Sequence, residues 1–394
     1  MKILFVGNGL LDTDNYPEVN QGGSVQTWGV CRELSRGHKI YIVRRTTKNV
    51  DEVFDDVTLV KIKFAGLENL IHSTFMSKFY FISVTVSSLY FSLKSMKVIQ
   101  EINPDIICLI DRFSGFFPLM LKIPKVYVLH VPDGLDFTKA SAIYANKLNG
   151  ILFHVKKFLD YSLMDRSSKV VVLNRFIENF LKTKGFSNVI AIPNGIDFEK
   201  FSNKGDEKFI LFAGRFDWNK NVYSLVSAFA GIHKLNSDYN LYLVGSGPEE
   251  RRIRTLVKEN GLQSNVKIIP WMPRDKLIDL MGRCSIFVLP SFSEVFPVVL
   301  LEAMASAKPV VARANMGSVE VIVHGFNGFL YENTEEMINY IRILISNEDL
   351  RRTMGDRSRR IVENKYTFSK VAEVYETECF NEIYRKVDLL TNAT

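Results

Sequence analysis

Short runs of apolar residues recur along the chain, separated by longer stretches whose apolar positions repeat with the period of a helix. This alternation is typical of βαβ units and predicts parallel sheets. We expect a first series of strands at Lys2–Val6, Lys39–Val43, Val57–Ile62, Asp105–Ile110, Lys125–His130, Val170–Leu173 and Val189–Ile192. A second series is expected at Phe209–Ala213, Leu241–Val244, Val266–Ile269, Ile286–Leu289 and Val310–Ala312. Helical patterns then fill the chain from Thr334 to about Leu390.

Between the two series lies a polar stretch, PNGIDFEKFSNKGDEK, which holds Pro193 and two glycines. Such a change of composition predicts a boundary between domains. We therefore expect an α/β chain of two Rossmann-like domains, one over residues 1–203 and the other over 204–372. The 394 residues are enough for two domains of ordinary size.

The composition is that of a soluble globular protein, with 47% apolar and 24% charged residues. A net charge of +7 fits either attraction to anionic partners or a mildly basic surface without a special partner. We expect no nucleic-acid partner, because the chain lacks zinc-finger spacing, an RNP-type aromatic motif and a basic stripe. Four scattered cysteines favour a reducing, cytoplasmic setting, and no apolar run is long enough for a transmembrane helix.

The segment 64–97 is rich in Phe and Tyr, with lysines interspersed. Its pattern predicts one or two amphipathic helices. Aromatic and basic residues on one helix suit an anionic membrane surface, which predicts peripheral contact with the inner face of a membrane. An equally good interpretation is that the segment only packs against the sheet of its own domain.

The block PSFSEVFPVVLLEAMASAKPVV carries the strongest chemical signal. Glu294 follows a predicted strand, and Pro297 suits the first position of a helix because its missing N–H would be unpaired there anyway. Amides around Phe296 and Val298 would then point out of the helix start, where phosphate groups bind. About one turn further on, Glu302 could accept hydrogen bonds from two vicinal hydroxyls, as on a ribose. An alternative is that Glu302 is a buried acid satisfied by a local backbone donor.

A second signal is FAGRFDWNKN, in which Arg215 follows a predicted strand and Lys220 comes five residues later. Cations at the carboxyl end of a strand occupy the usual ligand position of open α/β sheets. Together they could neutralise a diphosphate and stabilise it as a leaving group. By themselves, the two residues could equally be solvated surface charges.

Weaker signals lie at three other strand ends. In LVGSGPEE, Gly245 occupies a strand-to-helix turn that resembles half of a dinucleotide fingerprint. In QGGS, Gly22 and Gly23 would let the backbone approach a phosphate closely. His130 ends another strand and could touch a substrate, although a histidine in this position is more often structural.

One motif points to a metal, and we reject it. Asp12 and Asp14 spell the D-x-D with which many glycosyltransferases hold a divalent cation. No other carboxylate cluster supports such a site, so we interpret this segment as a polar turn and expect no metal.

Taken together, these blocks resemble the retaining glycosyltransferases of family 4, which have the GT-B fold. The likeness covers nearly the whole chain and is most specific in GRFDWNKN, LVGSGPEE, the E-x7-E block with EAMASAKPVVA, and HGFNGFL. It implies two domains facing each other across a cleft, with a final helix, about residues 373–394, crossing back to the first domain. It also implies transfer of a sugar from a UDP-, GDP- or ADP-sugar to a sugar or lipid-linked acceptor, with retention and without any cofactor.

The resemblance further implies roles for single residues of the second domain. Arg215 and Lys220 would bind the diphosphate. Glu302 would hold the ribose hydroxyls, and Glu294 would contact the transferred sugar.

For the remaining positions, the resemblance implies that the backbone around Trp271 and Met272 borders the base. Gly23 would reach the diphosphate from the first domain, and His130 would lie near the sugar. The leaving phosphate would help to deprotonate the incoming hydroxyl, so no dedicated protein base is expected.

Two positions depart from the family pattern. Asn221 follows Lys220, and Val295 follows Glu294, where the family usually has glycine. Because both positions act mainly through their backbone, the changes bear on the identity of the donor rather than on the activity.

Three other functions share parts of this pattern. A nucleotide-sugar epimerase or phosphorylase-like enzyme could use the same fold, but only six histidines are present for an epimerase. An NAD-dependent enzyme would need a complete G-x-G-x-x-G with an acidic residue downstream, which is absent. A non-catalytic carbohydrate-binding relative would not need all four charged residues, yet it could retain them.

Overall fold

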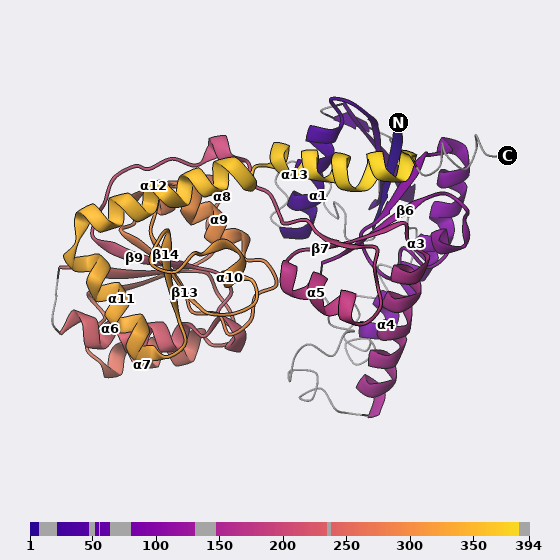
Figure 1. The fold of residues 1–394 in the computed structure, drawn as a ribbon. Helices are drawn as coiled ribbons and strands as arrows, with labels where there is room; N and C mark the ends of the chain where they lie inside the picture. The colour runs from indigo at the N-terminus through magenta and orange to yellow at the C-terminus, as the bar shows by residue number, and fades with distance from the viewer. Residues whose placement is uncertain are drawn as a thin grey trace. The chain divides into compact units, whose positions relative to one another are not determined.

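In the computed structural model, the chain is described at residues 1–7, 22–46, 52–54, 56–63, 80–130, 147–234 and 238–385. It divides into two compact units, Met1–Pro193 with Val371–Thr394, and Asn194–Lys370 (Figure 1). The division falls at Pro193 rather than at residue 203, because the start of the polar stretch packs on the second unit. The amide of Ile196 donates to the carbonyl of Tyr366 at 2.9 Å, and that of Lys204 to the carbonyl of Gly282 at 2.7 Å.

The first unit is built on an eight-stranded sheet of order β3-β4-β2-β1-β5-β6-β7-β8. Its strands are β1 (Lys2–Val6), β2 (Lys39–Thr46), β3 (Glu52–Phe54), β4 (Val57–Lys63), β5 (Ile106–Leu109), β6 (Lys125–Leu129), β7 (Lys169–Val172) and β8 (Val189–Ala191). All seven predicted strands are confirmed. An additional strand, β3, was not predicted; it is a three-residue edge strand that pairs antiparallel with β4.

The helices of the first unit are α1 (Gly22–Leu34), α3 (Tyr80–Ile102), the 3₁₀ turn η2 (Pro118–Met120), α4 (Lys147–Arg166) and α5 (Arg175–Thr183). Helix α3 confirms a helix in the aromatic-rich segment, while residues 64–79 lie outside the described residues. Two further short 3₁₀ turns, η4 (Phe198–Lys200) and η5 (Trp218–Lys220), belong to the second unit.

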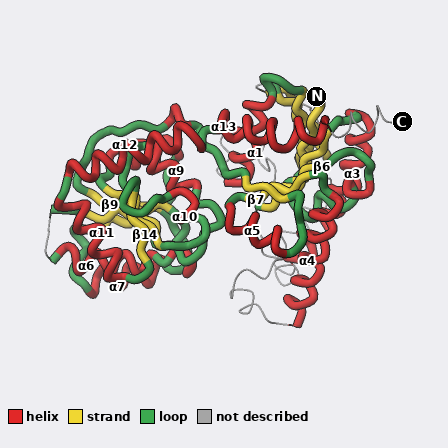
Figure 2. Tube along the Cα trace, in the orientation of Figure 1, coloured by secondary structure: helices red, strands yellow, loops and turns green. Residues whose placement is uncertain are grey.

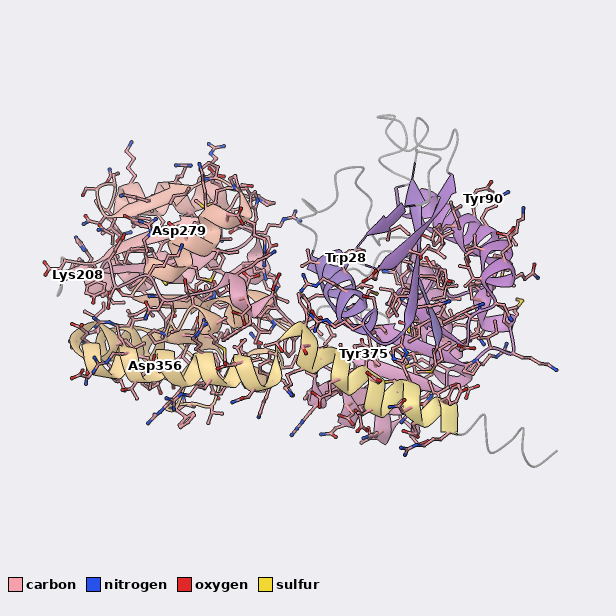
Figure 3. The ribbon with its side chains drawn as sticks, turned by 90° about the horizontal axis from the view of Figure 1, so that it is seen from above. Trp28, Tyr90, Lys208, Asp279, Asp356 and Tyr375 are labelled. Atoms are coloured by element: carbon pink, nitrogen blue, oxygen red, sulfur yellow. The ribbon has the colours of Figure 1, made fainter. Side chains whose placement is uncertain are left out.

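The end of the chain returns to the first unit, as expected. Helix α13 (Phe368–Val374) continues into the π-helical turn η6 (Tyr375–Phe380), and from Val371 onward these residues belong to that unit (Figure 3). The ring of Phe380 lies edge-on to that of His38 at 6.4 Å, and His38 Nε2 lies 3.6 Å from Glu376 Oε1. Lys169 of β7 pairs with Glu382.

The second unit holds a six-stranded, wholly parallel sheet of order β11-β10-β9-β12-β13-β14 (Figure 2). The strands are β9 (Phe209–Ala213), β10 (Asn240–Val244), β11 (Val266–Ile269), β12 (Ile286–Leu289), β13 (Val310–Arg313) and β14 (Gly328–Tyr331). Five were predicted, and β14 was missed because its apolar run is short and starts with a glycine. The helices are α6 (Val222–His233), α7 (Glu250–Glu259), α8 (Arg274–Arg283), α9 (Val298–Ala305), α10 (Ser318–Val321), α11 (Thr334–Ser346) and α12 (Glu348–Lys365).

Helices cover both faces of this sheet, with α6, α7 and α11 on one side and α8, α9 and α12 on the other (Figure 1). The central strands β9 and β12 are buried along their whole length, as continuous apolar runs require in a doubly covered parallel sheet. Asn333 and Asn347 cap α11 and α12 with their side chains, which explains where these two helices begin. None of the helices in the described ranges is long and apolar enough to cross a bilayer.

Candidate functional site

The carboxyl ends of β9 and β12 flank the point at which the strand order of the second sheet reverses. Strands β10 and β11 lie on one side of β9, whereas β12, β13 and β14 lie on the other. Ligands of open α/β sheets bind outside the carboxyl ends of the strands at such a point. Arg215 and Lys220 follow β9 and Glu294 follows β12, so the topology gathers these predicted site residues at one place.

Lys220 and Glu294 are in direct contact across this point. Lys220 Nζ donates to Glu294 Oε1 at 2.6 Å. The two side chains keep 24% and 14% of their surface exposed, so the pair is partly shielded but open to a ligand. An ammonium group held in this way can attract a phosphate, and the carboxylate beside it can accept hydrogen bonds from hydroxyls.

A clamp of backbone and amide hydrogen bonds joins the two loops that carry this pair. The side chain of Asn219 donates to the carbonyl of Ser293 at 2.9 Å and accepts from its amide at 3.1 Å. The amide of Phe292 donates to the carbonyl of Asn219 at 2.8 Å. These bonds fix the residues next to Lys220 and Glu294, and so hold the two side chains at the same point.

Asn221 explains one departure from the family pattern. It adopts a left-handed conformation, with φ of 49°, directly before α6. Glycine adopts this conformation without strain, and asparagine is one of the few other residues that visit it routinely. The backbone shape is therefore preserved without the usual glycine.

Arg215 lies at the same strand end, but its ion pair is with Asp217 rather than with Glu294. Its side chain is 67% exposed, and its Nε lies 3.8 Å from Asp217 Oδ2. This loose ion pair leaves the guanidinium able to reach an anionic ligand.

Glu302 is buried on α9, with 8% of its side chain exposed. Arg274 Nη2 donates to its Oε1 at 2.5 Å. Burial raises the pKa of Glu302, and the Arg274 guanidinium opposes that rise. The acid in an apolar helix thus has a charged partner from another helix, rather than a local backbone donor.

The start of α9 differs slightly from the prediction. Pro297 is the residue before the first helical one, Val298, and no side chain caps the helix. Phe296 is 6% exposed, and its ring lies 5.9 Å from that of Tyr366, so the side chain belongs to the core. Only the backbone of Phe296 is therefore available to a ligand.

Gly245 has a structural reason to be glycine. Its φ is +144°, and a Cβ atom there would lie 1.9 Å from the carbonyl oxygen of Gly214. At Gly247 a Cβ would lie 2.3 Å from the carbonyl oxygen of Phe216. The glycines of LVGSGPEE thus allow the loop after β10 to pack against the loop after β9, independently of any ligand.

The aromatic residues at this edge were only partly anticipated. Trp271 is 55% exposed, and Met272 is half-buried, just before α8. Trp218 was not predicted; it is 62% exposed, and its ring lies 5.2 Å from that of Phe292 in a tilted arrangement. A tryptophan within the polar loop FDWNKN was the signal that could have found it.

In the first unit, His130 directly follows β6. Its Nε2 atom is buried and, within the residues that the structure describes, has no hydrogen-bond partner. Burial lowers the pKa of His130 to about 4, against an opposing effect of Asp111. The imidazole is therefore neutral at pH 7.

The other predicted features of the first unit are less defined. Gly22 and Gly23 are the first two residues of α1. Asp12 and Asp14 lie outside the described residues. Across the described ranges, no group of three or more His, Cys, Asp or Glu side chains could hold a metal ion.

Comparison with known protein families finds a match for each half of the chain. The model for "Glycosyl transferases group 1" matches residues 194–361, and that for "Glycosyltransferase Family 4" matches residues 21–200. An uncharacterized glycosyltransferase of Methanocaldococcus jannaschii is 33% identical over 262 residues, which cover 65% of this chain and 69% of the relative.

Solved structures agree on the fold. The chain is similar to sucrose-phosphate synthase from Thermosynechococcus elongatus, with a TM-score of 0.74, 18% identity and 99% of both chains covered. It is also similar to Anabaena HepE in complex with UDP, with a TM-score of 0.69, 18% identity, and 96% of this chain and 99% of the other covered. With two parallel-sheet domains, matching family models on both halves and a relative of this identity, the chain belongs to the group 1 glycosyltransferases of family 4 and has the GT-B fold.

Proposed function

We propose that this glycosyltransferase takes its sugar from a nucleoside diphosphate sugar, and that the second unit binds this donor. The observation that carries the proposal is the Lys220–Glu294 contact of 2.6 Å at the point where the strand order reverses. A diphosphate needs cations, and the sugar attached to it needs hydroxyl acceptors. This contact supplies one of each, side by side.

In this proposal, each charged residue has one task. Lys220 and Arg215 neutralise the diphosphate and stabilise it as a leaving group. Glu294 accepts hydrogen bonds from the transferred sugar, and Glu302 accepts those of the ribose. For His130, which is neutral at pH 7, the proposed task is contact with the transferred sugar.

We further propose that transfer proceeds with retention and without a metal ion. The acceptor oxygen attacks on the face that the phosphate leaves, and the leaving phosphate oxygen takes the proton of the incoming hydroxyl. The two cations supply the positive charge that a divalent ion would otherwise provide, so an added chelator should leave the rate unchanged.

The first nucleotide to test is UDP. Structures of Anabaena HepE, which share this fold, were solved with UDP and with UDP-glucose. GDP- and ADP-sugars remain alternatives, because the base would contact backbone around Trp271 and Met272 rather than a distinctive side chain.

For the acceptor, we propose a sugar or a lipid-linked sugar in glycan biosynthesis, reached from the cytoplasmic face of a membrane. The support is one exposed face of α3, where Tyr90 and Leu93 are 39% and 51% exposed and are followed by the exposed Lys94 and Lys97. These positions share a helix face, with apolar and basic groups combined as in interfacial helices. Sedimentation with phosphatidylcholine vesicles, with and without phosphatidylglycerol, tests this contact. Binding that depends on the anionic lipid and falls in Leu93→Glu supports it, and no sedimentation contradicts it.

The donor proposal is tested by a thermal-shift screen against UDP, GDP, ADP and their common sugar conjugates, in the absence of metal. A ligand at 100 times its dissociation constant adds about 2.7 kcal/mol to the free energy of unfolding, enough for a clear shift. A shift with one nucleotide identifies the base. No shift with any of them would contradict the donor site and favour a carbohydrate-binding protein without transferase activity.

A further inference from the structure

Arg274 is the first residue of α8, and its side chain reaches the buried carboxylate of Glu302 on α9. The Nη2–Oε1 distance is 2.5 Å. Glu302 is almost covered, with 8% of its side chain exposed, whereas Arg274 keeps 42% exposed. The ion pair therefore runs from the interior of the second unit to its surface.

The position of Arg274 is unfavourable for a cation considered by itself. The first turn of a helix carries the positive end of the helix dipole, which favours acids and disfavours bases. The rest of α8 follows this preference, with Asp275 in the first turn and Arg283 in the last. Arg283 and Asp279 form an ordinary exposed pair near the other end of the helix. The unfavourable position of this cation at the start of α8 is compensated by its ion pair with Glu302.

Arg274 is also the charged group that acts on Glu302. No charged residue in the described parts of the neighbouring helices α10 and α12, or of β12 and β13, contributes to the electrostatics of this carboxyl. Without Arg274, the carboxylate would be buried with no described counter-charge, and a buried ionised acid without a partner is strongly disfavoured.

One oxygen of the carboxylate is engaged and the other is not. Oε1 accepts from Arg274, whereas Oε2 accepts no hydrogen bond from any residue in the described part of the chain. A carboxylate fixed by one oxygen presents the other in a defined direction. Such an oxygen can accept hydrogen bonds from vicinal hydroxyls without first losing an internal partner.

We propose that Arg274 is a positioning residue for ribose recognition: it anchors Glu302 by one oxygen and leaves the other to accept the ribose hydroxyls of the donor. The inference rests on the proposed donor site, in which Glu302 meets the ribose. Because only Pro273 separates Arg274 from Trp271 and Met272, the segment that would border the base also holds the ribose acceptor. Recognition of base and of ribose is thereby coupled through one short loop.

The test compares the binding of UDP with that of 2′,3′-dideoxy-UDP, measured by calorimetry between about pH 5.5 and 8. If the thermal-shift screen identifies another nucleotide, that nucleotide and its dideoxy form are used instead. Wild type should prefer the ribonucleotide by about 10- to 100-fold, the size of a lost hydrogen bond to a charged group. Arg274→Gln should lose most of this preference at the acidic end of the range, because the pKa of Glu302 rises further without the guanidinium, and regain part of it at the basic end. Arg274→Lys, which keeps a cation, should retain most of the preference.

The dideoxy nucleotide reports whether the site is intact, since its affinity should not change in Arg274→Gln. Lys276→Gln is the matched control, because it removes an exposed cation from the same helical turn without a contact to Glu302. An unchanged, pH-independent preference in Arg274→Gln would overturn the role of Arg274 and leave the donor site standing. Equal binding of both nucleotides by wild type would instead remove the ribose role of Glu302, and with it this inference. Absence of any nucleotide binding would contradict the proposed function itself.

Discussion

The two glutamates of the E-x7-E block have different surroundings, and this difference separates their proposed tasks. Glu294 lies at a loop with 14% of its side chain exposed and contacts Lys220. Glu302 lies inside a helix layer and contacts Arg274. Each acid therefore contacts a different cation, one beside the proposed diphosphate and one beside the proposed ribose.

Replacing Lys220 by alanine should reduce turnover more than donor affinity. The ammonium group would stabilise charge that grows on the leaving diphosphate, and removing one such donor typically lowers kcat by about 100- to 1,000-fold. Steady-state kinetics with the donor found in the screen measure the effect. Lys258→Ala, which removes an exposed lysine from α7, should leave kcat unchanged. Wild-type turnover in Lys220→Ala would remove this residue from the site.

His130 should make the stability of the protein depend on pH between 4 and 7. Its pKa is about 4 in the folded chain and near 6.5 when unfolded. As the pH falls below 6.5, the unfolded state takes up the proton first, so the free energy of unfolding decreases; at pH 5 the loss is about 2 kcal/mol. Denaturant unfolding at pH 7 and pH 5 should show this extra loss in wild type and not in His130→Gln. Equal losses in both proteins would mean that the imidazole is not buried in its neutral form.

At the level of elements, the candidate site depends on how closely two loops approach each other. The loop after β10 lies against the loop after β9, and Gly245 and Gly247 leave no room for a side chain. The loop after β9 is in turn tied to the loop after β12 through Asn219. Three neighbouring strand ends are thus held together by close backbone contact and hydrogen bonds.

Gly245→Ala should therefore destabilise the second unit by about 3–5 kcal/mol. The substitution combines backbone strain at φ of +144° with a Cβ placed 1.9 Å from a carbonyl oxygen. Gly261→Ala is the matched control, because its φ is +67° and no atom lies within 4 Å of the added Cβ. It should cost about 1–2 kcal/mol, from strain alone. Equal losses in the free energy of unfolding for the two variants, measured by denaturant unfolding, would contradict the close packing at Gly245.

At the level of the whole molecule, the end of the chain completes the core of the first unit. Three buried cysteines come together there, Cys31 of α1, Cys108 of β5 and Cys379 of η6, and burial raises the pKa of all three thiols. The first unit therefore cannot be completed until the second unit has been synthesised.

Phe380→Ala should loosen this returning helix. Phe380 is fully buried, and truncating a buried phenylalanine costs about 3–5 kcal/mol. Thiol labelling under native conditions should become faster in this variant, because the buried cysteines in the helix and beneath it are exposed more often. Tyr384→Ala, four residues further on and 47% exposed in wild type, should label like wild type. Labelling of Phe380→Ala at the wild-type rate would show that the helix does not cover the thiols.

Much of the fold was predictable from local pattern. The predicted strands from Lys2–Val6 to Val310–Ala312 were found, because a buried parallel strand is a continuous apolar run that can be recognised without its neighbours. The short edge strands β3 and β14 were missed, since a few residues paired on one side leave little pattern. The exposed Trp218 was missed for a related reason: Phe292, whose ring it contacts, is distant in the sequence.

The sequence by itself determined the order of the elements and the chemical groups at the ends of the strands, because apolar runs, turn residues and charged loops are local features. Only the tertiary structure decided which of these groups meet. Lys220 contacts Glu294 across 74 residues, and Arg274 contacts Glu302 across 28. Neither pairing can be inferred from spacing, because each depends on which strands and helices are neighbours, and that order is set by packing of the whole domain.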